Sequence, residues 1–311
     1  MNPLSAIFGA GVALRNALYD RGALKVRKLA RPVVSVGNLS VGGSGKTPFV
    51  ITLGQLLKQR GIVFDVLSRG YGRSSVEIAV VNADGSPEQF GDEPLLIARS
   101  LQVPVIVGAD RFLAGLLAEE CFDSKLHLLD DGFQHRGLHR DFDIVLLPAA
   151  DLTGTLLPVG RLREPLSSLR RADAVASESP DLACEAKTVW KMNRELFLSP
   201  LSSPAAAFCG IARPSQFFAQ LRAIGVKLAD TASFADHHRY TASDIDRLIR
   251  LRSSCGATDL ITTEKDMINL GSLANQLEPL QVARLRLVLA APQEALSTLL
   301  STLERRSGCR F

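Results

Sequence analysis

The segment VVSVGNLSVGGSGKTPFV, residues Val33–Val50, decides the fold that this sequence predicts. An apolar run rich in β-branched residues leads into a glycine-rich loop, and a helical pattern follows the loop. Because glycine has no side chain, Gly42, Gly43 and Gly45 let backbone N–H groups turn inward around a phosphate. The residues expected to hold the phosphates of a nucleotide are Gly42, Gly43, Ser44, Gly45, Lys46 and Thr47.

Lys46 and Thr47 complete this phosphate loop. The lysine supplies a positive charge for the outer phosphates, and the threonine hydroxyl is placed to bind Mg²⁺. Ser40 stands where the strict pattern G-x-x-x-x-G-K-S/T has its first glycine, so a glycine-rich turn with a chance Lys-Thr pair is the alternative interpretation. The strand–loop–helix context favours the phosphate loop, and the sequence therefore predicts a bound nucleoside triphosphate.

The composition is that of a globular protein with room for two domains. The chain has 311 residues, 46% of them apolar, which argues against disorder. Its five cysteines include no C-x-x-C pair, so we expect reduced thiols rather than a disulfide framework or a zinc site. The net charge is only +4, but basic residues crowd the N-terminal region: Arg15, Arg21, Lys25, Arg27, Lys28 and Arg31.

The N-terminal segment is apolar but too short to cross a membrane. Its longest apolar candidate, Pro3–Leu14, falls below the about 20 residues that a spanning helix needs. At the helical period one face is apolar, and Arg15 falls on that same face, where it can reach toward lipid headgroups. The apolar residues of this face are Leu4, Ile7, Phe8, Leu14 and Leu18. An interfacial membrane helix and an ordinary docked helix are equally compatible with the pattern.

Apolar runs and helical patterns alternate after this segment, which is typical of a doubly wound, mainly parallel α/β sheet. The expected strands are Val33–Val36, Ile62–Leu67, Val103–Val107, Leu126–Leu129, Ile144–Leu147 and Ala174–Ala176, and the expected helices are Thr47–Arg60, Glu93–Ser100 and Arg111–Cys121. Ligands of such sheets bind beyond the carboxyl ends of the strands, so the phosphate loop marks the edge of the site.

A second, smaller α/β domain is expected beyond a Pro/Ser cluster at Ser199–Pro204. Its expected strands are Ala205–Cys209, Val226–Leu228, Leu260–Thr262 and Leu285–Leu289, and its expected helices are Pro214–Ile224, Ser243–Leu251 and Gln293–Arg305. We therefore divide the chain into an N-terminal helix and linker (residues 1–30), a phosphate-loop domain (31–199) and a C-terminal domain that closes over the site (200–311).

Asp130 and Asp131 follow an apolar strand, LHLLDD, and form a candidate magnesium site. An acid at the end of a strand beside a phosphate loop holds Mg²⁺ directly or through water in many nucleotide-binding proteins. Two aspartates after a strand are otherwise a turn or a helix cap. The phosphate loop upstream favours the metal role.

Three further segments have both a functional and a structural interpretation. Ser68–Arg73, SRGYGR, suits a loop that closes on an anionic or sugar ligand, or a solvated basic turn. Asp92 in Gly91–Pro94 is either a helix-start acid or a base that accepts a proton from an attacking hydroxyl. The loop Leu157–Pro165 presents arginines that can offset phosphoryl charge, or is simply a rigid turn.

Two motifs of the second domain argue against other classes of site. Asp236–His238 is a poor zinc site because adjacent histidines in an extended segment diverge, so one histidine paired to a distant carboxylate is more credible. Thr262–Asp266, TTEKD, has the wrong residue order for the guanine-reading N-K-x-D element. We therefore reject GTP specificity on that basis.

Together these motifs resemble one family, the tetraacyldisaccharide 4'-kinases that phosphorylate the lipid A precursor of Gram-negative bacteria. Their order and spacing hold across nearly the whole chain, which makes the resemblance specific. The matching motifs are GNLSVGGSGKTP (Gly37–Pro48), SRGYG (Ser68–Gly72), GDEP (Gly91–Pro94), DDGFQH (Asp130–His135), LPVGRLREP (Leu157–Pro165), CGIARPSQFF (Cys209–Phe218), ADHH (Ala235–His238) and TEKD (Thr263–Asp266).

The resemblance implies transfer of the γ-phosphoryl group of ATP to the 4' hydroxyl of a tetraacylated glucosamine disaccharide 1-phosphate, with Mg²⁺. It implies two α/β/α domains around a cleft and a monomer attached peripherally to the cytoplasmic face of the inner membrane, with no nucleic-acid partner. By position, the matching residues are Lys46 and Thr47 of the phosphate loop, Asp92 as general base with His237 as its partner, Asp130 and Asp131 as Mg²⁺/ATP carboxylates, Arg163 and Glu164 as catalytic residues, and Gln134 and His135 as nucleotide-binding residues. Because Asp92 and His237 fall in different predicted domains, we hypothesise that closure of the cleft assembles the base.

The main rival is a membrane-associated switch ATPase without kinase activity. The loop GGSGKT resembles the deviant phosphate loop K-G-G-x-G-K-S/T of partition and septum-placement ATPases. Val41 stands where those proteins have their signature lysine, which argues against their dimerising mechanism. A GTP-dependent metal-insertion chaperone is a weaker rival, because the chain lacks both a proper guanine motif and a cysteine metal pair.

Overall fold

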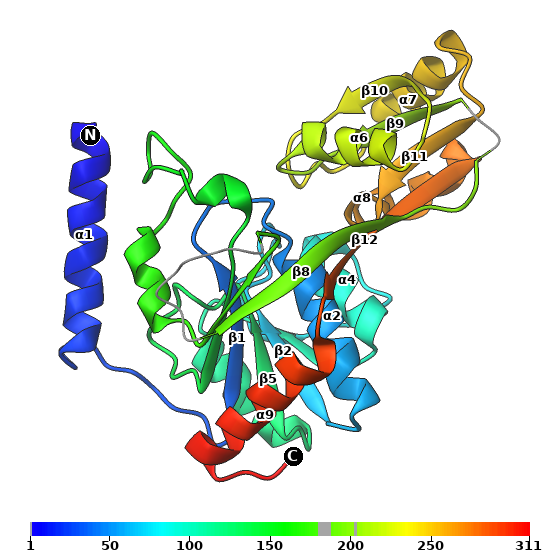
Figure 1. Cartoon of the computed structure of the whole chain (residues 1–311). Helices are drawn as coiled ribbons and strands as arrows, with labels where there is room; N and C mark the ends of the chain where they lie inside the picture. The colour runs from blue at the N-terminus through cyan, green and yellow to red at the C-terminus, as the bar shows by residue number, and fades with distance from the viewer. Residues whose placement is uncertain (1, 180–187, 202–203) are drawn as a thin grey trace.

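The structure, a computed structural model, describes residues 2–179, 188–201 and 204–311, and within them two lobes share one sheet (Figure 1). The sheet has 12 strands in the order β10-β9-β11-β12-β8-β7-β6-β1-β5-β2-β4-β3. The main-lobe strands are β1 (Val33–Asn38), β2 (Phe64–Ser68), β3 (Ala79–Val80), β4 (Val105–Val107), β5 (Leu126–Asp130), β6 (Phe142–Leu146) and β7 (Ala174–Ser177). The second-lobe strands are β9 (Ala205–Cys209), β10 (Leu228–Ser233) and β11 (Asp259–Thr263), and β8 (Thr188–Phe197) and β12 (Leu280–Leu289) run between the lobes.

The helices alternate with the parallel strands as the doubly wound prediction requires. Those of the main lobe are α2 (Lys46–Gln59), α3 (Pro87–Phe90), α4 (Asp92–Leu101) and α5 (Arg111–Cys121), and those that follow β9 are α6 (Pro214–Ala223), α7 (Ala242–Ser254), α8 (Glu264–Leu270) and α9 (Pro292–Ser307). Short 3₁₀ helices lie at Ala149–Asp151, Leu166–Arg171 and Gly271–Leu277. The α/β fold class is confirmed.

The register of the central strands brings the predicted motifs to one edge. β1 pairs in parallel with β5 and β6, and Val36 lies opposite Asp130. β2 pairs in parallel with β5, so Ser68 also ends at this edge. All residues of β1, β2 and β5 are buried, which is expected for central strands covered by helices on both faces. The phosphate loop after β1 therefore lies beside the ends of β2 and β5.

The long strand β8 is absent from the sequence prediction. Its side chains alternate between more and less exposed positions, and several of them are charged or polar, so it lacks the continuous apolar run of a buried parallel strand. It pairs in parallel with β7 and antiparallel with β12, and these two strands carry the chain between the lobes. In the Ser199–Pro204 cluster, which the sequence predicts to be a linker, Ser202 and Ser203 lie outside the described residues, as does Cys184.

The C-terminal helix α9 belongs to the main lobe, which differs from the assignment of residues 200–311 to one domain. Leu296, Leu299 and Leu303 are buried in the same apolar cluster as Val34 of β1. The chain therefore enters the second lobe through β8 and returns through β12, and α9 covers the main sheet (Figure 1). Apolar burial explains this return, because the amphipathic face of α9 would otherwise remain exposed.

Helix α1 (Pro3–Asp20) stands beside the main lobe (Figure 1), and several of its apolar side chains are exposed. Leu4, Ile7 and Leu14 are 60%, 71% and 61% exposed. Arg15, predicted to reach toward lipid, donates instead to the backbone carbonyl of Gln134. In the part of the chain that the structure describes, no helix has the length and apolar content needed to cross a membrane.

Candidate active site

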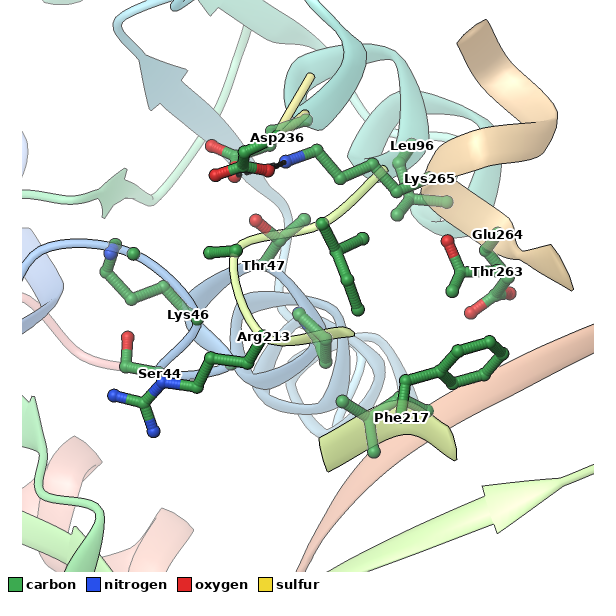
Figure 2. Close-up of a pocket in the computed structure, with 18 of the residues that line it drawn as sticks. Ser44, Lys46, Thr47, Leu96, Arg213, Phe217, Asp236, Thr263, Glu264 and Lys265 are labelled. Carbon is green, nitrogen blue, oxygen red and sulfur yellow. Dashed lines mark hydrogen bonds and ion pairs between the residues drawn. The ribbon is translucent and has the colours of Figure 1, made fainter. Parts of the chain in front are cut away.

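A cavity of about 560 Å³ lies between the lobes and is lined by residues of both. Figure 2 shows Lys46 and Thr47 of the main lobe together with Arg213, Asp236 and Lys265, which the second lobe contributes. The lining also includes the phosphate-loop glycines, the two aspartates after β5, Arg163 and His237. The structure thus brings together most of the residues that the sequence singles out.

The phosphate loop adopts the conformation that its glycines were expected to allow. Gly42, Gly43 and Gly45 have φ angles of +65°, +59° and +89°, in the region that other residues rarely adopt. Gly45 is the N-cap of α2 and supplies no side chain to bond the first N–H groups of that helix. These N–H groups and the helix dipole make the start of α2 a favourable place for phosphate oxygens.

Lys46 lies in a network of charges and amides at the base of the loop. Its Nζ is 3.5 Å from Oδ1 of Asp131 and 3.3 Å from Oδ1 of Asn38. Arg163 donates to the same two side chains, at 3.2 Å to Asp131 and 2.8 Å to Asn38. Burial alone raises the pKa of Asp131, but the charges of Lys46 and Arg163 outweigh it and hold the pKa below its ordinary value. Asp131 is therefore an anion held between two cations.

Asp130 has the opposite electrostatic environment although it is the neighbouring residue. Burial, with the charges of Glu93 and Asp131, raises its pKa to about 7. Ser68 donates to Oδ2 at 3.2 Å, whereas Oδ1 is buried and has no hydrogen-bond partner among the described residues. An unpartnered buried carboxylate oxygen fits a hard cation, which takes oxygen ligands. Thr47, which carries a hydroxyl, lines the same cavity, so these residues fit Mg²⁺.

Asp92 and His237 form a hydrogen-bonded pair across the lobes. Asp92 is the first residue of α4, and His237 lies in the loop after β10 with a φ of +59°. Nδ1 of His237 is 2.8 Å from Oδ2 of Asp92, and Asn269 donates to the same oxygen at 3.2 Å. Burial raises the pKa of Asp92, but the His237 hydrogen bond and the Lys265 charge outweigh it, so the pKa lies below its ordinary value. The histidine of Asp236–His238 that pairs with a distant carboxylate, as predicted, is thus His237. In this structure the lobes are close enough for the two side chains to form a hydrogen bond.

Asp92 does not line the cavity itself but adjoins it through its hydrogen bond to His237, and three further predicted site residues lie outside the lining. Glu164 is 1% exposed and binds Arg171 at 2.6 Å and Asn16 of α1 at 2.9 Å. The Gln134 side-chain amide donates to the backbone carbonyl of Asn38 at 2.8 Å. Burial and nearby arginines lower the pKa of His135 to about 4. Glu164 and Gln134 instead contact α1, through Asn16 and Arg15, and the roles expected for the three residues remain predictions.

The structure also adds cavity residues that the sequence reasoning did not select. Arg194 of β8 donates to the backbone carbonyl of Ser44 at 2.8 Å. The side chain of Arg213 crosses from the second lobe over Gly43, where an added Cβ would lie 2.9 Å from its Cγ. Lys265 approaches the Asp92–His237 pair and belongs to the TEKD motif, whose sequence alone indicates no role for the lysine in the reaction. No local pattern marks the two arginines, because their roles depend on how the second lobe is placed.

Comparisons with known proteins point to one family. The family described as "LpxK: Tetraacyldisaccharide-1-P 4'-kinase" matches residues 1–304. The chain is 54% identical to the tetraacyldisaccharide 4'-kinase of Koribacter versatilis over 99% of this chain and all of the relative, and 41% identical to that of Aquifex aeolicus over 88% and 90%. It is also similar to the crystal structure of "apo" form LpxK from Aquifex aeolicus in complex with ATP, with a TM-score of 0.79 and 36% identity over 97% of this chain and 98% of that one.

Proposed function

The chain belongs to the tetraacyldisaccharide-1-P 4'-kinase family, and we propose how its cleft carries out the phosphoryl transfer. It is a kinase of lipid A biosynthesis whose phosphoryl donor is ATP. The acceptor is the 4' hydroxyl of the tetraacylated disaccharide precursor. The observation that carries our proposal is the Asp92–His237 pair, whose histidine lines the same cavity as the phosphate loop.

In the proposed mechanism Asp92 accepts the proton of the acceptor hydroxyl. The O–H bond breaks as the acceptor oxygen bonds the γ-phosphorus, and the bond to the β-phosphate oxygen breaks to release ADP. Lys46 and the N–H groups at the start of α2 stabilise the charge on the phosphates. His237 orients Asp92 through its Nδ1–H. Arg163 holds Lys46 in place through the shared partners Asp131 and Asn38.

Thr47, Asp130 and Asp131 would hold Mg²⁺. When bound there, the ion would offset the negative charge of the outer phosphates. The unpartnered Oδ1 of Asp130 supports this assignment. In the described residues, no group of three or more His, Cys, Asp or Glu side chains is arranged to hold a metal by itself. The hydroxyl of Thr47 and phosphate oxygens would therefore complete the ligand set.

We propose that α1 attaches this monomeric protein to the cytoplasmic face of the inner membrane, without spanning it. The exposed side chains of Leu4, Ile7 and Leu14 support this role, because a docked helix would bury them. The acyl chains of the substrate then remain in the lipid while the sugar enters the cleft. We propose no nucleic-acid partner.

The mechanism is tested by following labelled γ-phosphate from ATP with and without the lipid disaccharide. We expect label on the lipid in the wild-type protein, and about 10²–10⁴-fold slower labelling in Asp92→Asn, as is typical when a general base is lost. Release of label only as free phosphate would support the switch ATPase instead. Wild-type turnover in Asp92→Asn would overturn the assignment of the base.

The membrane role is tested with Leu4→Ser, Ile7→Ser and Leu14→Ser combined in one protein. We expect slower turnover of substrate embedded in vesicles and little change with substrate in detergent micelles, because only the vesicle assay requires attachment to a bilayer. Val76→Ser, at an exposed apolar residue outside α1, is the matched control. Equal loss in vesicles and micelles would show that the face supports the fold rather than the membrane contact.

A further inference from the structure

The second ring nitrogen of His237 faces a buried lysine. Lys265 is the second residue of α8, and its side chain is 17% exposed. Its Nζ lies 3.3 Å from Nε2 of His237 and 3.1 Å from Oδ1 of Asp236. Figure 2 shows this lysine extending toward Asp236, with the ion pair drawn as a dashed line. Lys265 is therefore in direct contact with His237, the partner of the proposed general base Asp92.

Charges from two elements surround Lys265 and keep it protonated. Besides Asp236, the carboxylates of Asp92 and Glu93 at the start of α4 lie 3.7 Å and 3.9 Å from Nζ. Burial lowers the pKa of Lys265, but these three carboxylates outweigh it and raise the pKa above its ordinary value. An ammonium group has three donors and no acceptor. It can therefore meet Nε2 of His237 only where that nitrogen carries a lone pair.

This contact fixes where the proton of the imidazole lies. If Nε2 accepts from Lys265, the ring is neutral and its proton is on Nδ1, from which it is donated to Asp92 at 2.8 Å. A second proton on Nε2 would place two positive charges 3.3 Å apart. The lysine thus selects one tautomer of the histidine and leaves Asp92 as the acceptor.

We infer that Lys265 is a positioning residue of this kinase, whose ammonium group holds His237 as the neutral Nδ1–H tautomer and so keeps Asp92 ionised and oriented toward the acceptor hydroxyl. This inference rests on the proposed role of Asp92 as the base. Asp92 also accepts from the backbone N–H of Glu93 at 2.8 Å and from Asn269, so its orientation is fixed on several sides. Lys265 adds the control of protonation that those neutral donors do not supply.

The pH dependence of the reaction follows from the charges around His237. Burial and the Lys265 charge lower the pKa of His237. The Asp92 hydrogen bond and the charges of Asp92 and Asp236, whose Oδ2 lies 3.8 Å from Nε2, raise it, and the net direction is above the ordinary value. Below that pKa the ring gains a proton on Nε2 and the contact with Lys265 breaks. Removing the lysine charge raises the pKa of His237 further, so Nε2 of His237 takes up its proton at a higher pH.

The test compares Lys265→Met and Lys265→Arg with wild type by measuring kcat/KM from pH 5.5 to 9. At low pH kcat/KM falls, and we call this part of the pH profile the acid limb. In Lys265→Met we expect the acid limb to move upward by about one pH unit, so that kcat/KM decreases about tenfold more at low pH than at high pH. Lys265→Arg retains the charge and should restore most of the wild-type limb. Lys227→Met, at an exposed lysine of the second lobe, is the matched control and should match wild type.

Nitrogen-15 NMR of the five histidines tests the tautomer without relying on a variant that has to fold. Above the acid limb, wild-type His237 should show a protonated Nδ1 and an unprotonated Nε2. A protonated Nε2 with an unprotonated Nδ1 would overturn the inference. So would a Lys265→Met protein whose kcat/KM is lower by the same factor at every pH, with its acid limb unchanged. These results are distinct from failure of the proposed base, which would appear as an active Asp92→Asn protein.

Discussion

Two aspartate–histidine pairs, one inside the main lobe and one between the lobes, have the same hydrogen-bond length and opposite surroundings. Nδ1 of His127 is 2.8 Å from Oδ1 of Asp65, and Nδ1 of His237 is 2.8 Å from Oδ2 of Asp92. His127 and Asp65 are completely buried where β5 and β2 begin, away from the phosphate loop. His237 and Asp92 line or adjoin the cavity between the lobes, and the histidine side chain is 23% exposed.

The partner of the second ring nitrogen distinguishes the two pairs. Nε2 of His127 is 3.4 Å from the Glu119 carboxylate, which only accepts when ionised. Nε2 of His237 is 3.3 Å from the Lys265 ammonium, which only donates, and the Asp236 carboxylate lies farther from it, at 3.8 Å. Two acceptors favour a doubly protonated ring at His127, and an acceptor with a donor favours a neutral ring at His237. The comparison teaches that an Asp–His contact alone does not mark a catalytic pair.

Replacing each aspartate by asparagine should give the largest contrast. Asp92→Asn should lose about 10²–10⁴-fold in rate with little change in thermal stability, because it removes the proposed base. Asp65→Asn should lower the free energy of unfolding by about 3 kcal/mol, because it leaves a buried imidazolium without its main counter-charge. Rates per folded molecule and denaturant unfolding of both variants provide the measurement. A large rate loss in folded Asp65→Asn protein would contradict the separation of roles.

The stability contributed by His127 should depend on pH in a stated direction. Burial lowers the pKa of His127, but the hydrogen bonds to Asp65 and Glu119 outweigh it and raise the pKa above its ordinary value. The stabilisation is therefore complete below the unfolded-state pKa of about 6.5 and is lost as the pH rises through the folded-state value. We expect His127→Gln to be about 2 kcal/mol less stable than wild type near pH 6, with a smaller difference at alkaline pH.

The control for this experiment is His139→Gln, at a histidine whose side chain is 44% exposed and lies 3.4 Å from Asp141. Its unfolding free energy should follow that of wild type across the same pH range within about 1 kcal/mol, as is usual for an exposed ion pair. If the difference in the free energy of unfolding between wild type and His127→Gln grows as the pH rises, the ring of His127 is neutral. The contrast between the two Asp–His pairs then fails.

The sequence could predict the phosphate half of the site because its parts are local. The glycines, Lys46 and Thr47 lie in one short segment, and Asp130 follows a strand whose parallel pairing with β1 places it alongside. The α/β alternation likewise predicted most elements to within a few residues. Patterns of periodicity and spacing report such local geometry directly.

For the part of the site that lies between the lobes, the sequence could indicate single residues but not their contacts. The contact of Asp92 with His237 depends on β8 and β12, and β8 has no apolar run by which to detect it. The placement of α9 in the main lobe, and the turn of Glu164 toward α1, depend on packing between segments far apart in the chain. The functional pair His237–Asp92 and the structural pair His127–Asp65 look alike in sequence, because the deciding neighbours are set by tertiary structure.

The smallest expected effect concerns the ring that covers His237. Tyr71, in the loop after β2, has its ring centroid 5.0 Å from that of His237, and its side chain belongs to the cavity lining. Within the described residues no aromatic ring packs against His127 in this way, so this contact is a further difference between the pairs. Tyr71→Leu should lower kcat/KM by about threefold to tenfold, the size expected for one aromatic contact. Tyr71→Phe keeps the ring and should retain wild-type rates. An equal loss in both variants would assign the effect to the phenolic hydroxyl, and no loss in either would leave Lys265 and Asp92 as the sufficient supports of His237.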